Sequence, residues 1–121
     1  MNVEMLRLED EDPTKEIYQA KREGQVLGQV TAKVIDYEAE IYDIFVEVDV
    51  RGQGIGRKLF SHLLQSLQEK GVQVVFLEVR ETNLPAIKIY ETSGFVPYGR
   101  RENYYKNPRE DAILMRKELC L

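Results

Sequence analysis

The chain has 121 residues, enough for one domain around one hydrophobic core, and we expect a single domain over residues 1–121. Hydrophobic residues account for 43% of it and charged residues for 31%, a balance typical of globular proteins. Seventeen basic and 21 acidic side chains leave a net charge of −4, which argues against direct nucleic-acid binding through a basic face. No apolar run approaches the roughly 20 residues that a membrane span needs, so we expect no membrane partner.

Three further observations narrow the class of protein. The only cysteine, Cys120, stands one residue from the end, so the sequence has no disulfide framework. Residues 1–4 do not resemble the start of a signal peptide, and we expect a cytoplasmic location. No set of His, Cys, Asp and Glu side chains has the spacing of metal ligands, and we expect no metal site.

The first half of the chain predicts four strands. Short apolar or alternating segments cover residues 3–8, 17–22, 26–35 and 40–46. The charged run 9–12 and a proline separate the first two strands, and a Glu-Gly turn at 23–24 joins the arms of a hairpin. On the second arm, alternate positions predict one face, formed by Val26, Gly28, Val30, Ala32 and Val34.

A glycine-rich stretch, Val50-Arg51-Gly52-Gln53-Gly54-Ile55-Gly56-Arg57, follows the fourth strand and opens a predicted helix over residues 54–70. Glycine lets the backbone turn tightly and approach a ligand closely, and the first N–H groups of a helix lack intrahelical partners. A strand, a glycine turn and a helix start together predict a pyrophosphate cradle. Two common cradles are excluded, because the dinucleotide motif needs glycine at Arg57 and the P-loop needs Gly-Lys at Arg57-Lys58.

The second half predicts a strand, a short helix and a final pair of strands. Residues 72–79 are almost continuously apolar, as expected of a strand covered on both faces. Together with the strand 40–46 and the first helix, they predict a right-handed crossover between parallel strands. Thr82 and Asn83 offer capping side chains for a helix over residues 85–93. Strands at 95–102 and 111–119 flank a polar and aromatic loop at 103–108.

Two residues of this half are candidates for chemistry. Glu78 shares a strand face with Val74 and Phe76, where a carboxylate is costly unless it is paired, hydrogen-bonded or exposed in a cleft. It is either a general base or a structural partner of Arg80 or a lysine. Tyr90, on the short helix, is either a core aromatic or a proton donor, since a phenol with a pKa of about 10 is protonated at neutral pH.

Several stretches together resemble the GNAT-type N-acetyltransferases. They are the loop pattern Arg51-x-x-Gly54-x-Gly56, the run 77–95, and the runs Arg100-Arg101-Glu102-Asn103-Tyr104-Tyr105 and Arg109-Glu110-Asp111-Ala112-Ile113-Leu114-Met115. The later runs are similar to the bacterial ribosomal-protein alanine N-acetyltransferases, and the match extends from about residue 41 to residue 115. The resemblance implies an α/β protein with the GNAT fold, which has a mixed, mostly antiparallel sheet, a central parallel strand pair and flanking helices.

The resemblance also implies roles for residues of this chain. Glu78 would be the general base, Tyr90 the general acid, and acetyl-CoA the co-substrate. The implied contacts with acetyl-CoA lie at a strand end, on the glycine stretch and before the short helix: Ile44, Phe45, Val46, Arg51, Gly52, Gln53, Gly54, Ile55, Gly56, Arg57 and Asn83. The implied reaction moves the acetyl group to an amine, most simply the N-terminal α-amine of a protein.

The chain departs from this family between its first two strands, where the family has two helices that wall one side of the acceptor site. Only about eight residues, 9–16, stand there. We therefore expect an acceptor site that is open, completed by a second copy in a homodimer, or covered by Tyr104, Tyr105 and Pro108. Two other functions stay open: acetylation of a small-molecule amine or a lysine side chain, and a non-catalytic module that binds acetyl-CoA.

Overall fold

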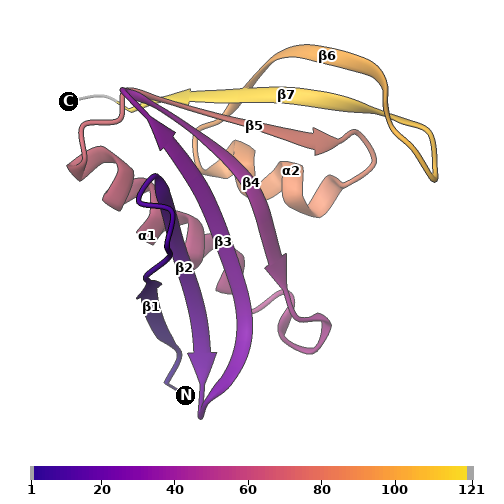
Figure 1. The fold of residues 1–121 in the computed structure, drawn as a ribbon. Helices are drawn as coiled ribbons and strands as arrows, with labels where there is room; N and C mark the ends of the chain where they lie inside the picture. The colour runs from indigo at the N-terminus through magenta and orange to yellow at the C-terminus, as the bar shows by residue number, and fades with distance from the viewer. Residues whose placement is uncertain (1, 120–121) are drawn as a thin grey trace.

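The computed structural model describes residues 2–119, so Cys120 lies outside the described part of the chain. Strands, one short 3-10 turn and two helices follow one another as labelled in Figure 1: β1 Glu4–Leu8, β2 Lys15–Arg22, β3 Gln25–Ile35, β4 Glu38–Val46, η1 Val48–Val50, α1 Ile55–Glu69, β5 Val74–Arg80, α2 Leu84–Thr92, β6 Val96–Tyr105 and β7 Glu110–Glu118. Every strand and helix predicted from the sequence is present, with its ends shifted by a few residues.

The described strands form one sheet in the order β1-β2-β3-β4-β5-β7-β6. Neighbouring strands are antiparallel except for β4 and β5, which run parallel in the centre. This confirms the expected mixed sheet with a central parallel pair. α1 connects these two strands as the predicted crossover. Figure 1 shows the consequence for shape: the half containing β1 to β4 and the half containing β5 to β7 diverge like the arms of a V.

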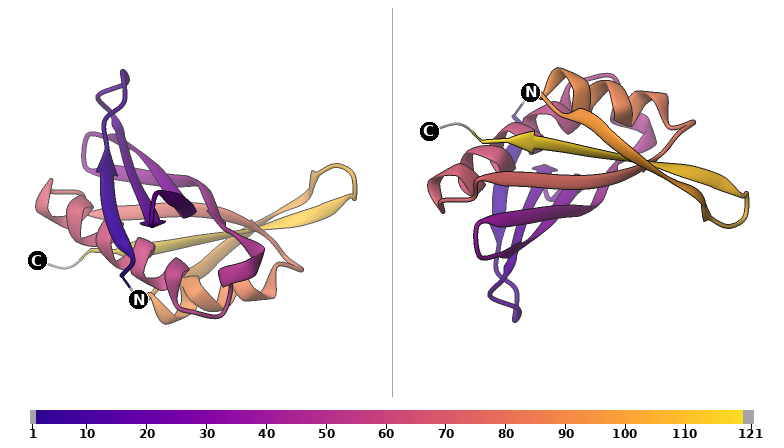
Figure 2. Two further views of the ribbon diagram at one scale, coloured as in Figure 1. Left: turned by 90° about the horizontal axis from the view of Figure 1, so that it is seen from below. Right: turned by 90° about the horizontal axis from the view of Figure 1, so that it is seen from above.

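Both helices cover the same face of the sheet, as the two views in Figure 2 show. The apolar side chains of α1 that are fully buried against the sheet recur at helical spacing and are Leu59, Phe60, Leu63 and Leu67. Tyr90 of α2 joins the same core, with its ring centroid 5.2 Å from that of Phe60. The helices can approach because Gly56 has no side chain; a Cβ there would lie 3.1 Å from Ile89 Cδ1. Neither described helix is long and apolar enough to cross a membrane.

The opposite face of the sheet carries no helix within residues 2–119. Residues 9–14 join β1 to β2 without forming one, as their number led us to expect. Large apolar side chains are left exposed on this face, namely Ile35, Tyr42, Phe45, Tyr98 and Tyr104. The prediction that β5 is covered on both faces is therefore wrong. Val75, Leu77 and Val79 are buried under the helices, whereas Val74 and Phe76 on the other face are partly exposed.

The predicted apolar face of β3 is wrong at its start. Leu27 enters the core with 1% exposure, whereas Val26 is only partly buried. A bulge in the pairing of β2 with β3 near Lys21 adds one residue there and changes which side chain faces inward. Val30 and Ala32, beyond the bulge, are fully buried as predicted.

Glu16 of β2 links the sheet to the end of α1 although its side chain is only 1% exposed. Its carboxylate accepts hydrogen bonds from Arg7 at 3.1 and 3.2 Å and pairs with Lys70 at 2.9 Å. Burial raises the pKa of Glu16, but the bonds from the two cations outweigh burial, so the pKa lies below its ordinary value. Both cations remain partly exposed, which keeps the cost of dehydrating the cluster small.

Candidate functional site

The central strands β4 and β5 separate part-way along their length. The last residues that pair are Ile41 and Leu77. Beyond them both strands continue without pairing to each other, and Figure 1 shows them diverging. We call the region beyond Ile41 and Leu77 the β4–β5 fork. Beyond this point, the backbone groups on the facing edges of β4 and β5 form no hydrogen bonds from one strand to the other.

Backbone groups of β4 point into the fork. Successive N–H groups along a strand point to opposite edges, and the N–H of Glu47 bonds to Leu27 O of β3 at 2.8 Å. The N–H and C=O groups of Val46 and Ile44 therefore point toward β5. Phe45, between them, directs its backbone to β3 and leaves its side chain 41% exposed. Ile44 thus offers its N–H and C=O to the fork, and Val46 offers its N–H, because Val46 O accepts a hydrogen bond from Arg51 Nε.

The glycine stretch after β4 has the geometry of an anion cradle. Gly52 and Gly54 have φ of 85° and 82°, and a Cβ at either position would meet no atom within 4 Å. Gly54 is the N-cap of α1, Gln53 beside it is exposed, and Lys58 N–H makes a helical bond to Gly54 O at 3.1 Å. The N–H groups before Lys58 in the first turn lack helical partners. No acidic residue stands in that turn, and the helix dipole adds positive charge, so the stretch fits a pyrophosphate.

Three of the expected contact residues use their side chains within the protein. Arg51 Nε donates to Val46 O at 3.0 Å and ties the glycine stretch to the end of β4. Ile55 is 3% exposed, so only its backbone is available to a ligand. Asn83 caps α2, where its Oδ1 accepts a hydrogen bond from Ala86 N–H at 3.3 Å.

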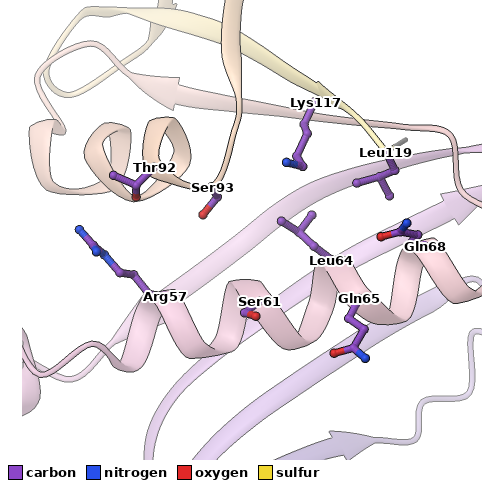
Figure 3. Close-up of a pocket in the computed structure, with 9 residues that line it drawn as sticks. All are labelled: Arg57, Ser61, Leu64, Gln65, Gln68, Thr92, Ser93, Lys117 and Leu119. Carbon is purple, nitrogen blue, oxygen red and sulfur yellow. The ribbon is translucent and has the colours of Figure 1, made fainter. Parts of the chain in front are cut away.

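A hollow of about 460 Å³ runs along α1 beside the end of α2, away from the fork (Figure 3). Arg57 points into it from the first turn of α1, toward Thr92 and Ser93. Lys117 of β7 lies farther along it, and neither cation forms an ion pair with a described residue. Arg57 therefore adjoins the anion cradle, but its side chain is directed toward α2.

Glu78 lies on β5 just beyond the last β4–β5 pair, and its side chain is 27% exposed on the face without helices. Its Oε1 lies 3.2 Å from Arg101 Nε of β6. A hydrogen bond to the Glu78 carboxylate raises the pKa of the Tyr104 phenol. The alternative partner expected at Arg80 is wrong, because Arg80 pairs with Glu110 at 3.2 Å. Glu78 is thus a partly exposed carboxylate at the point where the two strands of the fork separate.

Tyr90 is 4% exposed and packs among aromatic rings, with centroid distances of 5.2 Å to Phe60 and 6.2 Å to Phe95. Burial raises the pKa of its phenol to about 12, and the charge of Tyr105 contributes. The phenol is therefore protonated at neutral pH, and its hydroxyl lies within electrostatic range of Tyr105. Tyr90 is a core aromatic by its packing, and it keeps a hydroxyl that can donate a hydrogen bond.

The hairpin that brings Arg101 and Tyr104 to Glu78 is longer than the sequence predicted. Residues 103–105 were expected in a loop but belong to β6. The pairing of β6 with β7 shifts register between Arg101 and Tyr105, and Asn103 adopts a positive φ of 52°. This irregularity interrupts the alternation that would have indicated a strand, which explains the error.

Arg80, at the end of β5, fixes the tip of this hairpin. Its guanidinium carbon lies 4.3 Å from the ring centroid of Tyr105, and Nη1 donates to Pro108 O at 3.2 Å. The same nitrogen bonds to Glu110, whose other oxygen accepts the Thr82 N–H at 2.7 Å. The hairpin and the loop before α2 are therefore held together through one carboxylate.

The structure places Glu78 where β4 and β5 separate, and the strand end and the glycine stretch farther along the β4 side of the fork. Sequence reasoning missed Arg101 and Tyr104 as neighbours of Glu78, and Arg80 as the residue that positions the hairpin. The only signal was the run of two arginines and two tyrosines at 100–105, which places cations and aromatic rings on one strand.

The comparisons with known proteins agree with this geometry. The model of the acetyltransferase (GNAT) family matches residues 2–95. The chain belongs to this family. It is 39% identical over 100 residues to the [ribosomal protein bS18]-alanine N-acetyltransferase of Escherichia coli K12, covering 81% of this chain and 68% of that protein. It is 32% identical to the putative enzyme of the same name from Bacillus subtilis 168, in a match that covers 87% of this chain and 70% of that protein. The family and the enzyme class expected from the sequence are confirmed.

Solved structures support the fold of this GNAT acetyltransferase. The ribosomal-protein-S18-alanine N-acetyltransferase from Escherichia coli matches with a TM-score of 0.86 and 34% identity, covering 92% of this chain and 73% of that one. The IAA acetyltransferase from Bacillus cereus, at 21% identity, shares the fold with a TM-score of 0.87. The match covers 98% of this chain and 100% of that one. A putative streptothricin acetyltransferase from Bacillus anthracis, in complex with acetyl coenzyme A, matches with a TM-score of 0.80 and 31% identity. The match covers 91% of this chain and 65% of that one.

Proposed function

We propose that this GNAT acetyltransferase moves the acetyl group of acetyl-CoA to the N-terminal α-amine of a protein, such as a ribosomal protein that begins with alanine. The observation that carries the proposal is the position of Glu78, a partly exposed carboxylate at the point where β4 and β5 separate. The Escherichia coli relative, named for alanine acetylation of ribosomal protein bS18, supports the choice of acceptor.

The residues present fit acetyl-CoA. The glycine stretch 51–57 suits the pyrophosphate, because the first N–H groups of α1 have no partner within the helix and a Cβ at Gly52 or Gly54 would meet no atom within 4 Å. The N–H and C=O of Ile44 suit an amide of an extended pantetheine chain, which would add to β4 as a short strand does, whereas Val46 O is already bonded to Arg51 Nε. Asn83 stands at the start of α2, three residues after the end of β5. Acetyl-CoA, when bound, supplies the acetyl thioester.

The protein's groups would then move protons. A free α-amine has a pKa of about 8, so Glu78 must take its proton, directly or through a water, before the nitrogen attacks. The Val46 N–H, directed into the fork, would polarise the carbonyl and stabilise negative charge on its oxygen. As the carbon–nitrogen bond forms and the carbon–sulfur bond breaks, the nitrogen would lose its second proton to solvent, and Tyr90 would hydrogen-bond to the sulfur, which departs as a thiolate. Full proton transfer from a phenol of pKa about 12 to a thiolate whose thiol has a pKa of about 8.5 would be uphill.

A transfer assay tests this function. Peptides that differ only in their first residue, each with its lysines omitted, are offered with acetyl-CoA, and thiol release is followed. We expect turnover with a free N-terminal alanine and none with the same peptide blocked at its N-terminus. Equal turnover of the blocked peptide would refute α-amine acetylation.

The open acceptor side favours a second candidate, a small amine or a lysine side chain, because no helix within residues 2–119 walls that side. A panel of small amines and an N-blocked lysine peptide separates it from the first. Calorimetric binding of acetyl-CoA without turnover of any amine would instead indicate a non-catalytic module.

A further inference from the structure

The sheet face without helices offers a hollow directly beside Glu78. The hollow has a volume of about 330 Å³ and is lined by Lys33, Ile35, Glu38, Ala39, Glu40, Tyr42 and Phe76. The parallel register places Glu40 opposite Phe76, and Glu78 follows Phe76 by two residues on the same face. Two residues along a strand span about 6.6 Å, so the hollow begins one short step from the candidate base.

Aromatic side chains extend this surface toward the β6–β7 hairpin. Tyr42, Tyr98 and Tyr104 are about half exposed, and the ring of Tyr98 packs against that of Phe76 with centroids 5.9 Å apart. Aromatic residues grouped in this way are enriched at binding surfaces. We call the following set the acceptor face: Glu38, Glu40, Tyr42, Phe76, Glu78, Tyr98 and Tyr104.

The charges on and around the acceptor face do not cancel. Three cations beside it each have a carboxylate partner, in the pairs Lys33–Asp12 at 3.9 Å, Arg101–Glu78 at 3.2 Å and Arg116–Glu118 at 2.9 Å. The side chains of Glu38 and Glu40 have no ion-pair or hydrogen-bond partner among residues 2–119. Glu40 is one of the negative charges that raise the pKa of the Tyr104 phenol, after the hydrogen bond to Glu78. Two carboxylates without an ion-pair partner therefore lie on this largely aromatic surface, where Lys33, which also lines the hollow, stands opposite Glu40 in the strand pairing and is itself paired with Asp12.

We propose that the acceptor face binds the N-terminal segment of the acceptor polypeptide and selects segments with a basic side chain among residues two to five. The proposal rests on the proposed function, because the α-amine must reach Glu78. An extended peptide advances about 3.3 Å per residue. With the α-amine at Glu78, its second and third residues pass Phe76 and Glu40, and its fourth and fifth approach Glu38. A basic side chain there meets an unpaired carboxylate, and an apolar one meets Tyr42.

A second copy of the chain is a poorer occupant of this face. In a two-fold dimer the same surface meets itself, so the unpaired carboxylates of both protomers, Glu38 and Glu40, add negative charge to one interface. Opposed like charges disfavour association, whereas a basic peptide neutralises them. The homodimer left open by the sequence is therefore disfavoured on this face, and the oligomeric state becomes one outcome of the test.

The test compares three peptides that share an N-terminal alanine and carry lysine, glutamine or glutamate at positions three and five. An ion pair at an exposed surface changes binding about two- to fivefold, so two carboxylates together change it by up to about 25-fold. We expect the lowest KM for the lysine peptide and the highest for the glutamate peptide, with kcat similar. The preference weakens as salt rises, because exposed charges are screened. Equal KM values for all three peptides would overturn the proposal.

Variants then assign the preference to this face. The preference for the lysine peptide should fall in the single variant Glu40→Gln and fall further in the double variant Glu38→Gln with Glu40→Gln. Glu40→Lys should reverse the preference in favour of the glutamate peptide. Glu91→Gln, on an exposed position of α2 on the helix side, is the matched control and should leave the preference unchanged. KM for acetyl-CoA should be constant in every variant. A charge preference that survives in Glu40→Lys would place the selecting residues elsewhere.

Binding separates this proposal from the proposed function. Fluorescence anisotropy of labelled peptides on the protein saturated with coenzyme A reports docking without turnover. Charge-selective docking without acetylation would support peptide binding at the acceptor face and refute the proposed acetylation. Acetylation without charge selection would support the proposed acetylation and overturn the role of the acceptor face. Sedimentation equilibrium that shows a dimer, lost in Glu40→Lys or competed by peptide, would assign the face to a second copy and overturn the proposal.

Discussion

Glu78→Gln tests the chemistry of the fork most directly. Glutamine keeps the size of the side chain and an oxygen that can accept the Tyr104 hydrogen bond, but it removes the base. Removal of a general base lowers turnover by about 10²–10⁴-fold, which corresponds to about 2.7–5.5 kcal/mol on the barrier at 1.36 kcal/mol per tenfold. We expect kcat to fall in this range with acetyl-CoA binding unchanged, because the anion cradle does not include Glu78.

The structure separates this effect from stability. The substitution also breaks the ion pair with Arg101, whose side chain is 56% exposed. An exposed pair contributes at most about 1 kcal/mol, so the unfolding free energy should change little. Glu118→Gln is the matched control, since it breaks another exposed arginine pair, that with Arg116 at 2.9 Å, on a strand away from the fork. It should leave kcat unaltered.

The assay is initial-rate thiol release with saturating acetyl-CoA, followed from pH 6 to 9, together with calorimetry for cofactor binding and urea unfolding. Turnover within threefold of the wild type across that range would refute a general-base role for Glu78. A large loss of cofactor affinity would likewise contradict the separation of cradle and base described above.

Other substitutions test the remaining parts of the structure. Tyr90→Phe keeps the buried ring and should lower kcat at least tenfold with little change in melting temperature; equal kcat would leave Tyr90 a packing residue. Gly54→Val should weaken acetyl-CoA binding measured by calorimetry, whereas Gly24→Val, at an equally positive φ with equally open space, should share its strain but not its binding defect. Glu16→Gln should lower the unfolding free energy in urea by about 1.5–3 kcal/mol, as expected for hydrogen bonds to charged groups, and Glu9→Gln, at a 91% exposed position, should not. Because the folded pKa of Glu16 lies below its unfolded value of about 4.3, its contribution is complete above that pH and is lost as the pH falls through the folded pKa, so the two proteins should converge in acid.

Local interactions explain what the sequence by itself determined. The glycine stretch, the first helix and the Asn83 cap each depend on residues within a few positions of one another, so spacing and residue type predict them. The parallel crossover follows from a strand, a helix and a strand in succession. The candidate cradle and the identities of Glu78 and Tyr90 could therefore be named before the fold was known, with the resemblance to GNAT enzymes assigning their roles.

Only the tertiary structure decided which residues surround Glu78 and which face of the sheet stays open. Arg101 and Tyr104 of β6 reach it across β7, which lies between β5 and β6, and local patterns do not encode this strand order. Bulges are also not encoded by local patterns. One extra residue in β3 turns Leu27 toward the core, and a separate register shift in β6 interrupts the alternation that would have predicted the end of that strand. The apolar run of β5 indicated burial on both sides, yet one of its faces is open, because whether a strand face is covered depends on elements elsewhere in the chain and not on the strand itself.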